Sequence, residues 1–325
     1  AEVAARAGVS TSTVDRVING RGGVHQKTVA LVERAVREIM GSDRTGYLAA
    51  VSRLDAILAG DGTEVTRGLA AAMVTAGEAA GARVEVAFVE RMNPQALADR
   101  LLAVAADGSS GIAVQALDHT IVREALHEIA RTDIPVVTVL TDMAGINRTA
   151  YVGLDNRAAG RTAGYLMGRF CRNSGKLAVV WGGELYRSHE ERESGFRGIL
   201  RSERPDLQCL EVITSNDDAV MAKARANEAI ERHRDLVGVY CVGGGITGVA
   251  AAIEEAGLAE KLVMIGHNCN SETKPHLLSG TIDALVHQDI EAIALHAVEC
   301  IIERRQPPGY SGIPVEIITK ENVSR

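Results

Sequence analysis

The chain contains few aromatic residues, no closely paired cysteines and no apolar leader segment. Phenylalanine, tryptophan and tyrosine make up 3% of its 325 residues, with a single tryptophan. Its five cysteines are scattered and show no C-x-x-C spacing, which argues against a disulfide framework and predicts reduced thiols. The opening residues carry charge and no long apolar stretch. We therefore expect a cytoplasmic protein.

Long hydrophobic runs are also scarce. One uncharged run, 236–253, reaches the length of a membrane span, but Gly243–Gly245 interrupts it. This run predicts a strand, a turn and a helix, so we expect no membrane association.

The composition is that of a globular protein, with 46% apolar and 24% charged residues. The net charge is −7, yet residues 1–50 hold seven Lys or Arg against five Asp or Glu. This asymmetry favours a mildly basic head, suited to a polyanion, on an acidic body.

After residue 50, short runs rich in β-branched residues alternate with helical patterns. Such alternation predicts parallel sheets with helices on both faces. A body of this length would strain a single core, so we expect two similar lobes. The expected strands are 54–58, 83–89, 111–117, 135–140, 176–181, 208–213, 237–242, 262–266 and 282–288, and the expected helices are 64–80, 94–106, 121–131, 190–201, 218–232, 246–255, 274–279 and 291–304.

The predicted organisation is a helical head over 1–41, a linker over 42–52 and a two-lobed body over 53–325. We expect the chain to cross between the lobes at 154–156, and to cross again near Gln288 and near Tyr310. The lobes would then comprise about 53–154 with 289–310, and about 155–288 with 311–325.

Three helical patterns occupy the head. A short helix is expected over 2–7, and Gly8 favours a tight turn because glycine takes positive φ without a Cβ clash. Ser10 is placed to cap a second helix over 11–18. A third helix, over 26–40, closes a small apolar core.

The second helix has an outward face suited to DNA. A helix set across a turn from its neighbour can enter the major groove, where arginine reads guanine and serine or threonine reads either base edge. Thr11, Ser12 and Arg16 face outward in this pattern. Spacing alone leaves open a small helical cap whose polar faces meet only solvent.

The head resembles the DNA-binding headpiece of the lactose-repressor/galactose-repressor (LacI/GalR) family of bacterial transcription regulators. The motifs are A-G-V-S at 7–10, T-V-x-R-V-x-N at 13–19 and V-x-x-x-T at 24–28, in the order that the family shows. The resemblance implies a helix-turn-helix head. The DNA-binding residues that it implies are Thr11, Ser12 and Arg16 at base edges, and Thr13, Asn19, Val24, Lys27 and Thr28 along the backbone.

Two features depart from the family pattern. Asp15 stands where many members carry serine, so its carboxylate must accept from a base amine or pair with Arg16. The link M-G-S-D-R-T-G-Y-L-A-A-V-S-R-L-D, over 40–55, lacks the Y-x-P-N-x-x-A-x-x-L hinge through which members wedge a leucine into the minor groove. The hinge is therefore atypical, and minor-groove kinking is not predicted.

The body is similar to periplasmic sugar-binding proteins, whose fold this regulator family uses to sense small molecules. Ligands of open α/β sheets bind beyond the carboxyl ends of the strands, where this chain offers polar side chains. By resemblance, Arg192, Asn268 and Gln288 fall where sugar binders place hydrogen-bonding residues, although each alone is also typical of a solvated loop. The candidate effector-binding residues are Asp142, Arg192, Asn268, Gln288, Thr63 and Glu64.

The scarcity of aromatic residues bears on the effector. Sugar sites commonly stack aromatic rings on the ligand, yet the loop L-A-G-D-G-T-E-V after the first strand has none. Trp181 and Tyr186 are candidates from the other lobe, with a core role as the alternative for Trp181. A sugar or polyol is the predicted effector, and a more acidic ligand drawn by Arg192 is the alternative.

We find no motif for catalysis, a cofactor or a metal. The stretch V-Y-C-V-G-G-G-I-T-G matches neither a P-loop nor a dinucleotide fingerprint and predicts a strand-to-helix turn. H-N-C at 267–269 is too sparse for a metal site, and S-H-E-E-R-E at 188–193 predicts a solvated helix. We expect no enzymatic activity, no cofactor and no bound metal.

The combined prediction is a cytoplasmic transcription regulator, a repressor, that binds double-stranded operator DNA as a homodimer and responds to a small-molecule effector. The alternative is a sugar-binding protein without DNA regulation. A sugar kinase would need a phosphate loop and a general base, neither of which we find.

Overall fold

The chain forms two compact units, Ala1–Ser52 and Arg53–Arg325. The computed structural model describes residues 2–18, 28, 32, 53–60, 63–306 and 312–323. The predicted linker and its atypical hinge lie outside the described residues, apart from Arg53, Leu54 and Asp55 at the end of the quoted link.

The N-terminal unit contains two short helices, α1 (Glu2–Ala7) and α2 (Thr11–Ile18). Both have the bounds predicted from the sequence. Of the predicted third helix, only Thr28 and Val32 are described, and both are helical. Val32 is fully buried, as is typical of an apolar core position.

The first sheet of the body, in the N-terminal lobe, has five parallel strands in the order β2-β1-β3-β4-β5. β-branched and other aliphatic residues dominate these strands, as expected of a parallel sheet that is covered on both faces. The strands are β1 (Arg53–Ala59), β2 (Arg83–Val89), β3 (Ile112–Val114), β4 (Val136–Val139) and β5 (Ala150–Val152).

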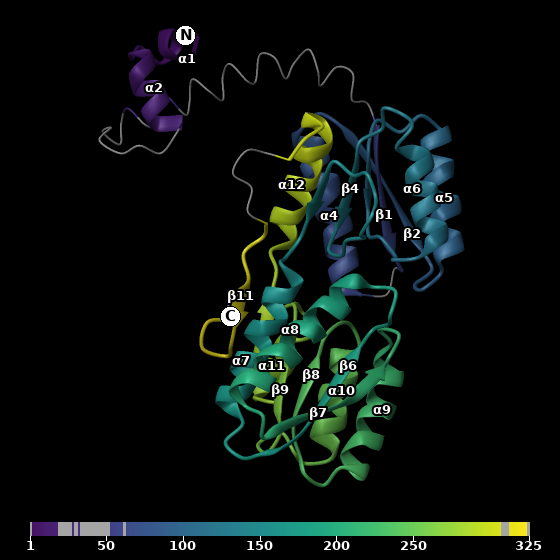
Figure 1. The fold of residues 1–325 in the computed structure, drawn as a ribbon, viewed down its shortest axis with the longest axis vertical. Helices are drawn as coiled ribbons and strands as arrows, with labels where there is room; N and C mark the ends of the chain where they lie inside the picture. The colour runs from purple at the N-terminus through teal and green to yellow at the C-terminus, as the bar shows by residue number, and fades with distance from the viewer. Residues whose placement is uncertain are drawn as a thin grey trace. The chain divides into compact units, whose positions relative to one another are not determined.

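Helices cover both faces of this sheet (Figure 1). On one face, α5 (Pro94–Ala106) and α6 (Thr120–Ile129) share an apolar core with the strands. Elsewhere in the lobe, α4 (Glu64–Ala79) packs against α12 (Ile290–Glu303), which also contacts β3, β4 and β5. The N-terminal lobe therefore depends on a helix from near the end of the chain.

The second sheet, in the C-terminal lobe, has six strands in the order β11-β10-β9-β8-β6-β7. All neighbours are parallel except β11, which is antiparallel to β10. The strands are β6 (Gly175–Trp181), β7 (Leu207–Thr214), β8 (Leu236–Cys241), β9 (Val263–His267), β10 (Ala284–His287) and β11 (Glu316–Ile318).

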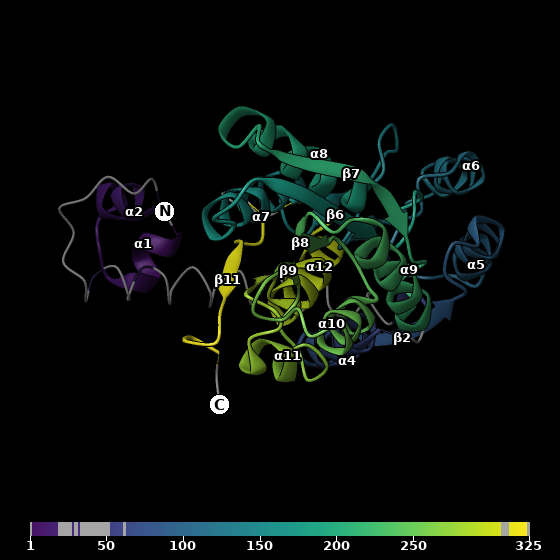
Figure 2. The same ribbon diagram turned by 90° about the horizontal axis from the view of Figure 1, so that it is seen from below.

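Two groups of helices lie on opposite faces of the second sheet, as Figure 2 shows. One face carries α7 (Asn156–Phe170) and α8 (Arg187–Glu203). The other carries α9 (Ala219–Arg232), α10 (Ile246–Glu255) and α11 (Lys274–Ser279), whose buried residues form one core with the strands. The predicted two-lobed α/β architecture of the body is confirmed.

The chain passes between the two lobes three times: after β5, after β10 and after α12. Two of these crossing segments lie side by side, because Leu154 and Ile313 form a parallel bridge. The backbone N–H of Ile313 donates to the carbonyl oxygen of Gly153 at 3.1 Å. Backbone hydrogen bonds therefore tie these two connections together.

Glycines allow α7 and α8 to pack closely. A Cβ at Gly160 of α7 would lie 1.9 Å from the carbonyl oxygen of Arg192, and one at Gly195 of α8 would lie 2.3 Å from that of Arg157. Only glycine permits backbones to approach so closely. The sequence pattern predicts neither α7 nor β5.

The apolar run 236–253 forms β8 and the first part of α10, so the predicted strand, turn and helix are confirmed. Among the described helices, none combines the length and the apolar character that a membrane span requires. All five cysteines, each at a described position, are free.

Candidate functional site

A cavity of about 410 Å³ lies between the lobes of the body, at the carboxyl ends of strands from both sheets. This volume falls within the range of small-molecule binding sites. The residues that line it follow β1, β2, β3 and β4 in one lobe and β6, β7, β8, β9 and β10 in the other. Both lobes therefore contribute polar groups to one candidate site.

Strained backbone is concentrated in the loops around this cavity. Non-glycine residues with positive φ are uncommon, and such conformations are often kept at functional sites. Here the strand-end loops hold five of them: Met92 (φ 56°), Leu140 (φ 63°), Asn216 (φ 52°), Asp217 (φ 56°) and Asn268 (φ 64°).

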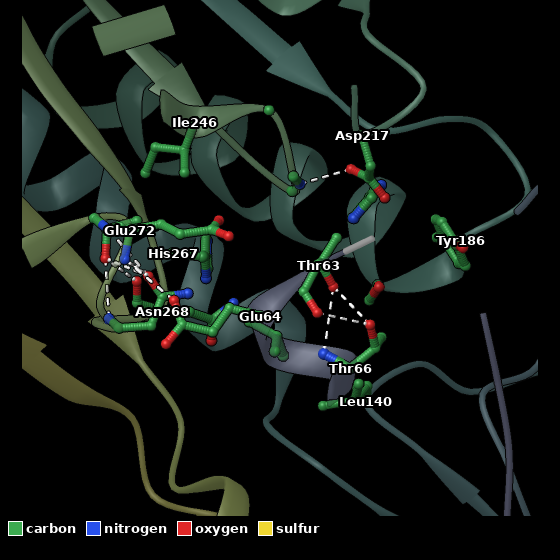
Figure 3. Close-up of a pocket in the computed structure, with 18 of the residues that line it drawn as sticks. Thr63, Glu64, Thr66, Leu140, Tyr186, Asp217, Ile246, His267, Asn268 and Glu272 are labelled. Carbon is green, nitrogen blue, oxygen red and sulfur yellow. Dashed lines mark hydrogen bonds between the residues drawn. The ribbon is translucent and has the colours of Figure 1, made fainter. Parts of the chain in front are cut away.

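Glu64 of the N-terminal lobe binds the C-terminal lobe across the mouth of the cavity. Its carboxylate accepts from the N–H of Ser271 (3.1 Å), the hydroxyl of Ser271 (2.8 Å) and the N–H of Glu272 (3.1 Å). Figure 3 shows Glu64 directed toward the loop that carries Glu272. Burial alone would raise the pKa of Glu64, but these hydrogen bonds and the charge of Arg67 lower it overall. The carboxylate is thus held ionised.

Further hydrogen bonds join the lobes. Arg91 donates through Nη1 to the carbonyl oxygen of Asp217 at 2.9 Å. The N–H of Ser188 donates to the hydroxyl of Thr141 at 3.2 Å. A ligand that alters the angle between the lobes would therefore act on these contacts.

Arg192 is a buried cation at the cavity wall, only 4% exposed. Its Nε donates to Asn156 Oδ1 at 2.8 Å and its Nη1 to the carbonyl oxygen of Val242 at 2.9 Å. Burial lowers the pKa of Arg192, although a guanidinium stays charged at neutral pH. The positive charge of Arg192 is therefore bound by neutral acceptors.

Two buried histidines line the cavity near Arg192, and both are neutral. Burial lowers the pKa of His189 to about 4, and the positive charge of Arg192 also lowers it. Burial, and after it the positive charge of Arg192, place the pKa of His267 well below its usual value. His267 Nε2 lies 2.7 Å from the hydroxyl of Tyr240, a fully buried residue. We assign the O–H of Tyr240 as the donor, since it has no other hydrogen-bond partner among the described residues, and the proton of His267 then resides on Nδ1.

Three buried polar atoms of the cavity wall have no hydrogen-bond partner among the described residues: His189 Nδ1, His267 Nδ1 and Gln288 Oε1. Gln288 is 2% exposed, and its Nε2 donates to Asn268 Oδ1 at 3.1 Å. Buried polar atoms rarely stay unpaired, because an unmade hydrogen bond is costly. Their common position indicates a site for a polar ligand.

The glycine-rich stretch 243–245 accommodates the side chain of Asp217. Asp217 Oδ1 accepts from the N–H of Gly244 at 2.6 Å, a contact drawn in Figure 3. A Cβ at Gly244 would lie 2.7 Å from Asp217 Cβ, and one at Gly182 would lie 1.8 Å from its Oδ1. The predicted strand-to-helix turn is confirmed, and its glycines make room for a carboxylate.

The structure brings five of the six candidate effector-binding residues to the cavity: Thr63, Glu64, Arg192, Asn268 and Gln288. Asp142 is the exception. It accepts from the hydroxyl of Thr138 and pairs with Arg148, so it does not line the cavity.

The aromatic candidates differ from each other. Tyr186 lines the cavity, whereas Trp181 lies elsewhere and donates through Nε1 to the hydroxyl of Thr214 at 3.1 Å. The helix expected to be solvated buries both His189 and Arg192.

Among the lining residues that were not identified from the sequence are Arg91, His189, Asp217 and His267. Arg91, Asp217 and His267 stand at or just after predicted strands, which is the signal that could have found them.

In the head, Ser10 organises the turn into α2. Its Oγ accepts from the N–H of Thr13 at 3.1 Å and lies 2.8 Å from the hydroxyl of Ser12, as an N-cap serine does. Thr11, Ser12 and Arg16 are exposed, and Thr13 is half-buried. Of the remaining predicted contacts, Thr28 is half-buried, while Asn19, Val24 and Lys27 lie outside the described residues.

Two family profiles match the chain. The profile described as "Periplasmic binding protein domain" matches residues 56–303, and the profile "Bacterial regulatory proteins, lacI family" matches residues 1–40. Both descriptions are of binding or regulatory proteins and not of enzymes. The chain therefore belongs to the periplasmic binding protein domain family and carries the helix-turn-helix head of the lacI family of bacterial regulatory proteins, as the resemblance predicted.

Solved structures share the fold of the body at low sequence identity. GanP, a glucose-galactose binding protein from Geobacillus stearothermophilus, is 24% identical with a TM-score of 0.76, over 84% of this chain and 99% of that chain. A solute-binding protein from Agrobacterium vitis, bound with α-D-tagatopyranose, is 22% identical with a TM-score of 0.77, over 84% and 96%. One from Burkholderia graminis, in complex with D-arabinose, is 20% identical with a TM-score of 0.78, over 84% and 97%. No protein of curated function matches the sequence.

Proposed function

We propose that this protein is a ligand-responsive transcription regulator, a repressor, that binds double-stranded operator DNA through its head and a sugar or polyol in its cleft. One observation carries the proposal: a single chain joins a lacI-type head to a body with a polar cavity between two lobes. The sugar ligands of the similar solved structures support the class of effector.

The exposed face of α2 is the proposed surface for reading bases. Arg16 suits guanine O6 and N7, and Thr11 and Ser12 suit either base edge. Thr13, Asn19, Lys27 and Thr28 would bind the DNA backbone and set the register. The proposed units are the head over 1–41, the linker over 42–52 and the body over 53–325.

The effector would act by favouring one arrangement of the lobes over another. Coupling between the cleft and the head requires that the effector bind two states of the body with different affinity. Contacts across the cleft, such as those of Glu64, would differ between these states. A cytoplasmic homodimer, with two heads on a pseudo-palindromic operator, completes the proposal.

The test is fluorescence anisotropy of the full chain on a labelled DNA fragment from upstream of its own gene, at fixed salt. We expect sequence-specific binding that one compound from a panel of sugars and polyols shifts. Competition with unrelated DNA separates specific binding from the salt-sensitive, non-specific kind.

The second candidate function is a sugar-binding protein without DNA regulation. The similarity of the body to solute-binding proteins favours it. Calorimetric binding of a sugar together with only non-specific DNA binding would support this function and contradict the regulator.

A further inference from the structure

One face of α7 carries exposed arginines on either side of an exposed aromatic ring. Arg161, Tyr165 and Arg169 follow one another at four-residue spacing, which places them on the same face of the helix. Both arginines are exposed, and Tyr165 is 46% exposed. Helix α7 contains no acidic residue, and no ion pair among the described residues engages either arginine. We call these three residues the basic stripe.

One face of α12 shows the opposite charge pattern at the same spacing. Glu291, Leu295 and Glu299 follow one another four residues apart, and α12 contains no lysine or arginine. Glu291 is exposed, Leu295 is 47% exposed, and the side chain of Glu299 is 30% exposed. Glu299 Oε2 lies 3.1 Å from His296 Nδ1, a contact that engages only one of the two carboxylate oxygens. We call Glu291, Leu295 and Glu299 the acidic stripe.

The two stripes are complementary in charge and in spacing. Each is symmetric about an apolar centre, so aligning Tyr165 with Leu295 sets arginines opposite glutamates whichever way the two helices run. Rows of residues four apart form ridges on a helix, and the packing of such ridges against each other is the commonest mode of helix contact. Arginine and tyrosine are also enriched in protein interfaces. The two faces therefore have the charges and the apolar centres of a helix-to-helix interface.

A single chain leaves both stripes open to solvent. Helix α7 belongs to the C-terminal lobe and α12 to the N-terminal lobe, and both lie on the side of the body that also carries β11 (Figure 1). Contact of α7 with α7 would bring arginines together, and contact of α12 with α12 would bring glutamates together, which is unfavourable. The surface that fits the basic stripe is therefore the acidic stripe of a second copy of the chain.

We propose that two copies of this chain associate through α7 of one and α12 of the other, with the basic stripe of each copy on the acidic stripe of its partner. A twofold axis makes this contact reciprocal, so it forms twice in each pair of copies. The inference deepens the self-association in the proposed function and rests on that part alone, since it requires neither DNA nor effector. Salt should weaken the contact, because its charges lie near solvent.

The test is size-exclusion chromatography with light scattering, which measures the mass of the full chain in solution at micromolar concentration. Arg161→Glu combined with Arg169→Glu sets glutamates opposite the acidic stripe. The mass of the complex should fall by half, and the dissociation constant should rise roughly 10-fold or more. Glu291→Arg combined with Glu299→Arg should have the same effect.

Mixing the two double variants provides the decisive measurement. In a mixed pair, the reversed α7 of one copy meets the reversed α12 of the other, and the unchanged stripes also meet. An equimolar mixture should therefore regain the mass of the wild type, which a misfolded variant would not allow. The matched control is Arg131→Glu combined with Arg225→Glu, two exposed arginines outside both stripes, and its mass should equal that of the wild type.

A photocrosslink gives a second measurement that changes no charge. p-Benzoylphenylalanine in place of Tyr165 should, on irradiation, join two chains and attach to a peptide of α12. The inference is overturned if the wild type is monomeric, if the stripe variants keep the wild-type mass, if the mixture does not regain that mass, or if the crosslink reaches other elements. Operator binding, measured by anisotropy, decides the regulator separately: specific binding by a protein whose mass the stripe variants leave unchanged would overturn only this inference.

Discussion

The carboxylate of Glu64 and the backbone of Ser271, which belong to different lobes, are joined by a hydrogen bond of 3.1 Å. The hydroxyl of the same serine donates to the second oxygen of Glu64, so one residue of the N-terminal lobe binds the C-terminal lobe through both oxygens. This contact stabilises the arrangement in which the lobes enclose the cavity.

Glu64→Gln should weaken closure of the lobes. The amide loses the charge that strengthens these bonds, and because the site is partly solvated we expect a rise in the effector Kd of roughly two- to fivefold. Glu78→Gln, an exposed position on the same helix, should leave the Kd unchanged. Since the pKa of Glu64 is lowered, the contact should persist at neutral pH and be lost only as the pH falls through that lowered pKa. A Kd unaffected by Glu64→Gln would contradict this role.

Arg16→Ala should remove discrimination between operator and unrelated DNA. A bidentate contact between arginine and guanine accounts for about 1–3 kcal/mol of discrimination, or roughly 5- to 150-fold in affinity. Binding of the effector, measured by calorimetry, should not change. Arg225→Ala removes an exposed arginine of the body, paired with Glu228, and serves as the control. Equal losses of affinity for operator and for unrelated DNA would show that Arg16 contacts only the backbone.

Gly160→Ala should destabilise the body. The new Cβ would lie 1.9 Å from the carbonyl oxygen of Arg192, which would force α7 and α8 apart at a cost of about 1–3 kcal/mol or more. Gly198→Ala, in α8, is the opposite case, because no atom lies within 4 Å of the added Cβ. It should stabilise the helix by up to about 1 kcal/mol. Urea unfolding of both variants tests this, and similar midpoints would contradict the close packing of the two helices.

The stability of the body should fall as the pH drops below 6.5. The pKa of His189 is about 4 in the folded protein, against 6.5 as the usual value, so the unfolded chain binds the proton first. The contribution of this residue to stability is present above pH 6.5 and declines between pH 6.5 and 4, by about 3 kcal/mol. Urea unfolding at several pH values measures how the free energy of unfolding changes with pH. His189→Gln should make this change smaller, while the part due to His267 remains. An unchanged pH dependence in the variant would exclude His189 as its source.

The sequence predicted the architecture well because strands and helices of parallel sheets carry regular apolar patterns. It failed at α7, where Gly160, Gly164 and Gly168 lower helix propensity and apolar content. Those glycines are explained only by α8, which lies opposite them in the folded protein. Local pattern therefore indicated α8 but gave no sign of its partner α7.

The candidate site was predictable where the chain resembles sugar binders and where polar residues follow predicted strands. The resemblance indicated Arg192 and Gln288, and both line the cavity. Asp142 follows β4 in the same manner, yet Arg148 draws its carboxylate away from the cavity. His189 was missed because its helix shows a polar sequence, and its burial depends on the position of Tyr186 and the glycine loop. Which residue each of these polar side chains contacts depends on the tertiary structure, and the local sequence carries no signal for it.

The threefold crossing between lobes has a consequence for biosynthesis. The helix α12, which contacts β3, β4 and β5, ends at Glu303, so the first sheet lacks this cover until most of the chain has left the ribosome. The antiparallel edge of the second sheet, β11, comes later still. Neither lobe is encoded by a continuous stretch, so a nascent chain truncated before α12 should expose apolar strands and bind chaperones.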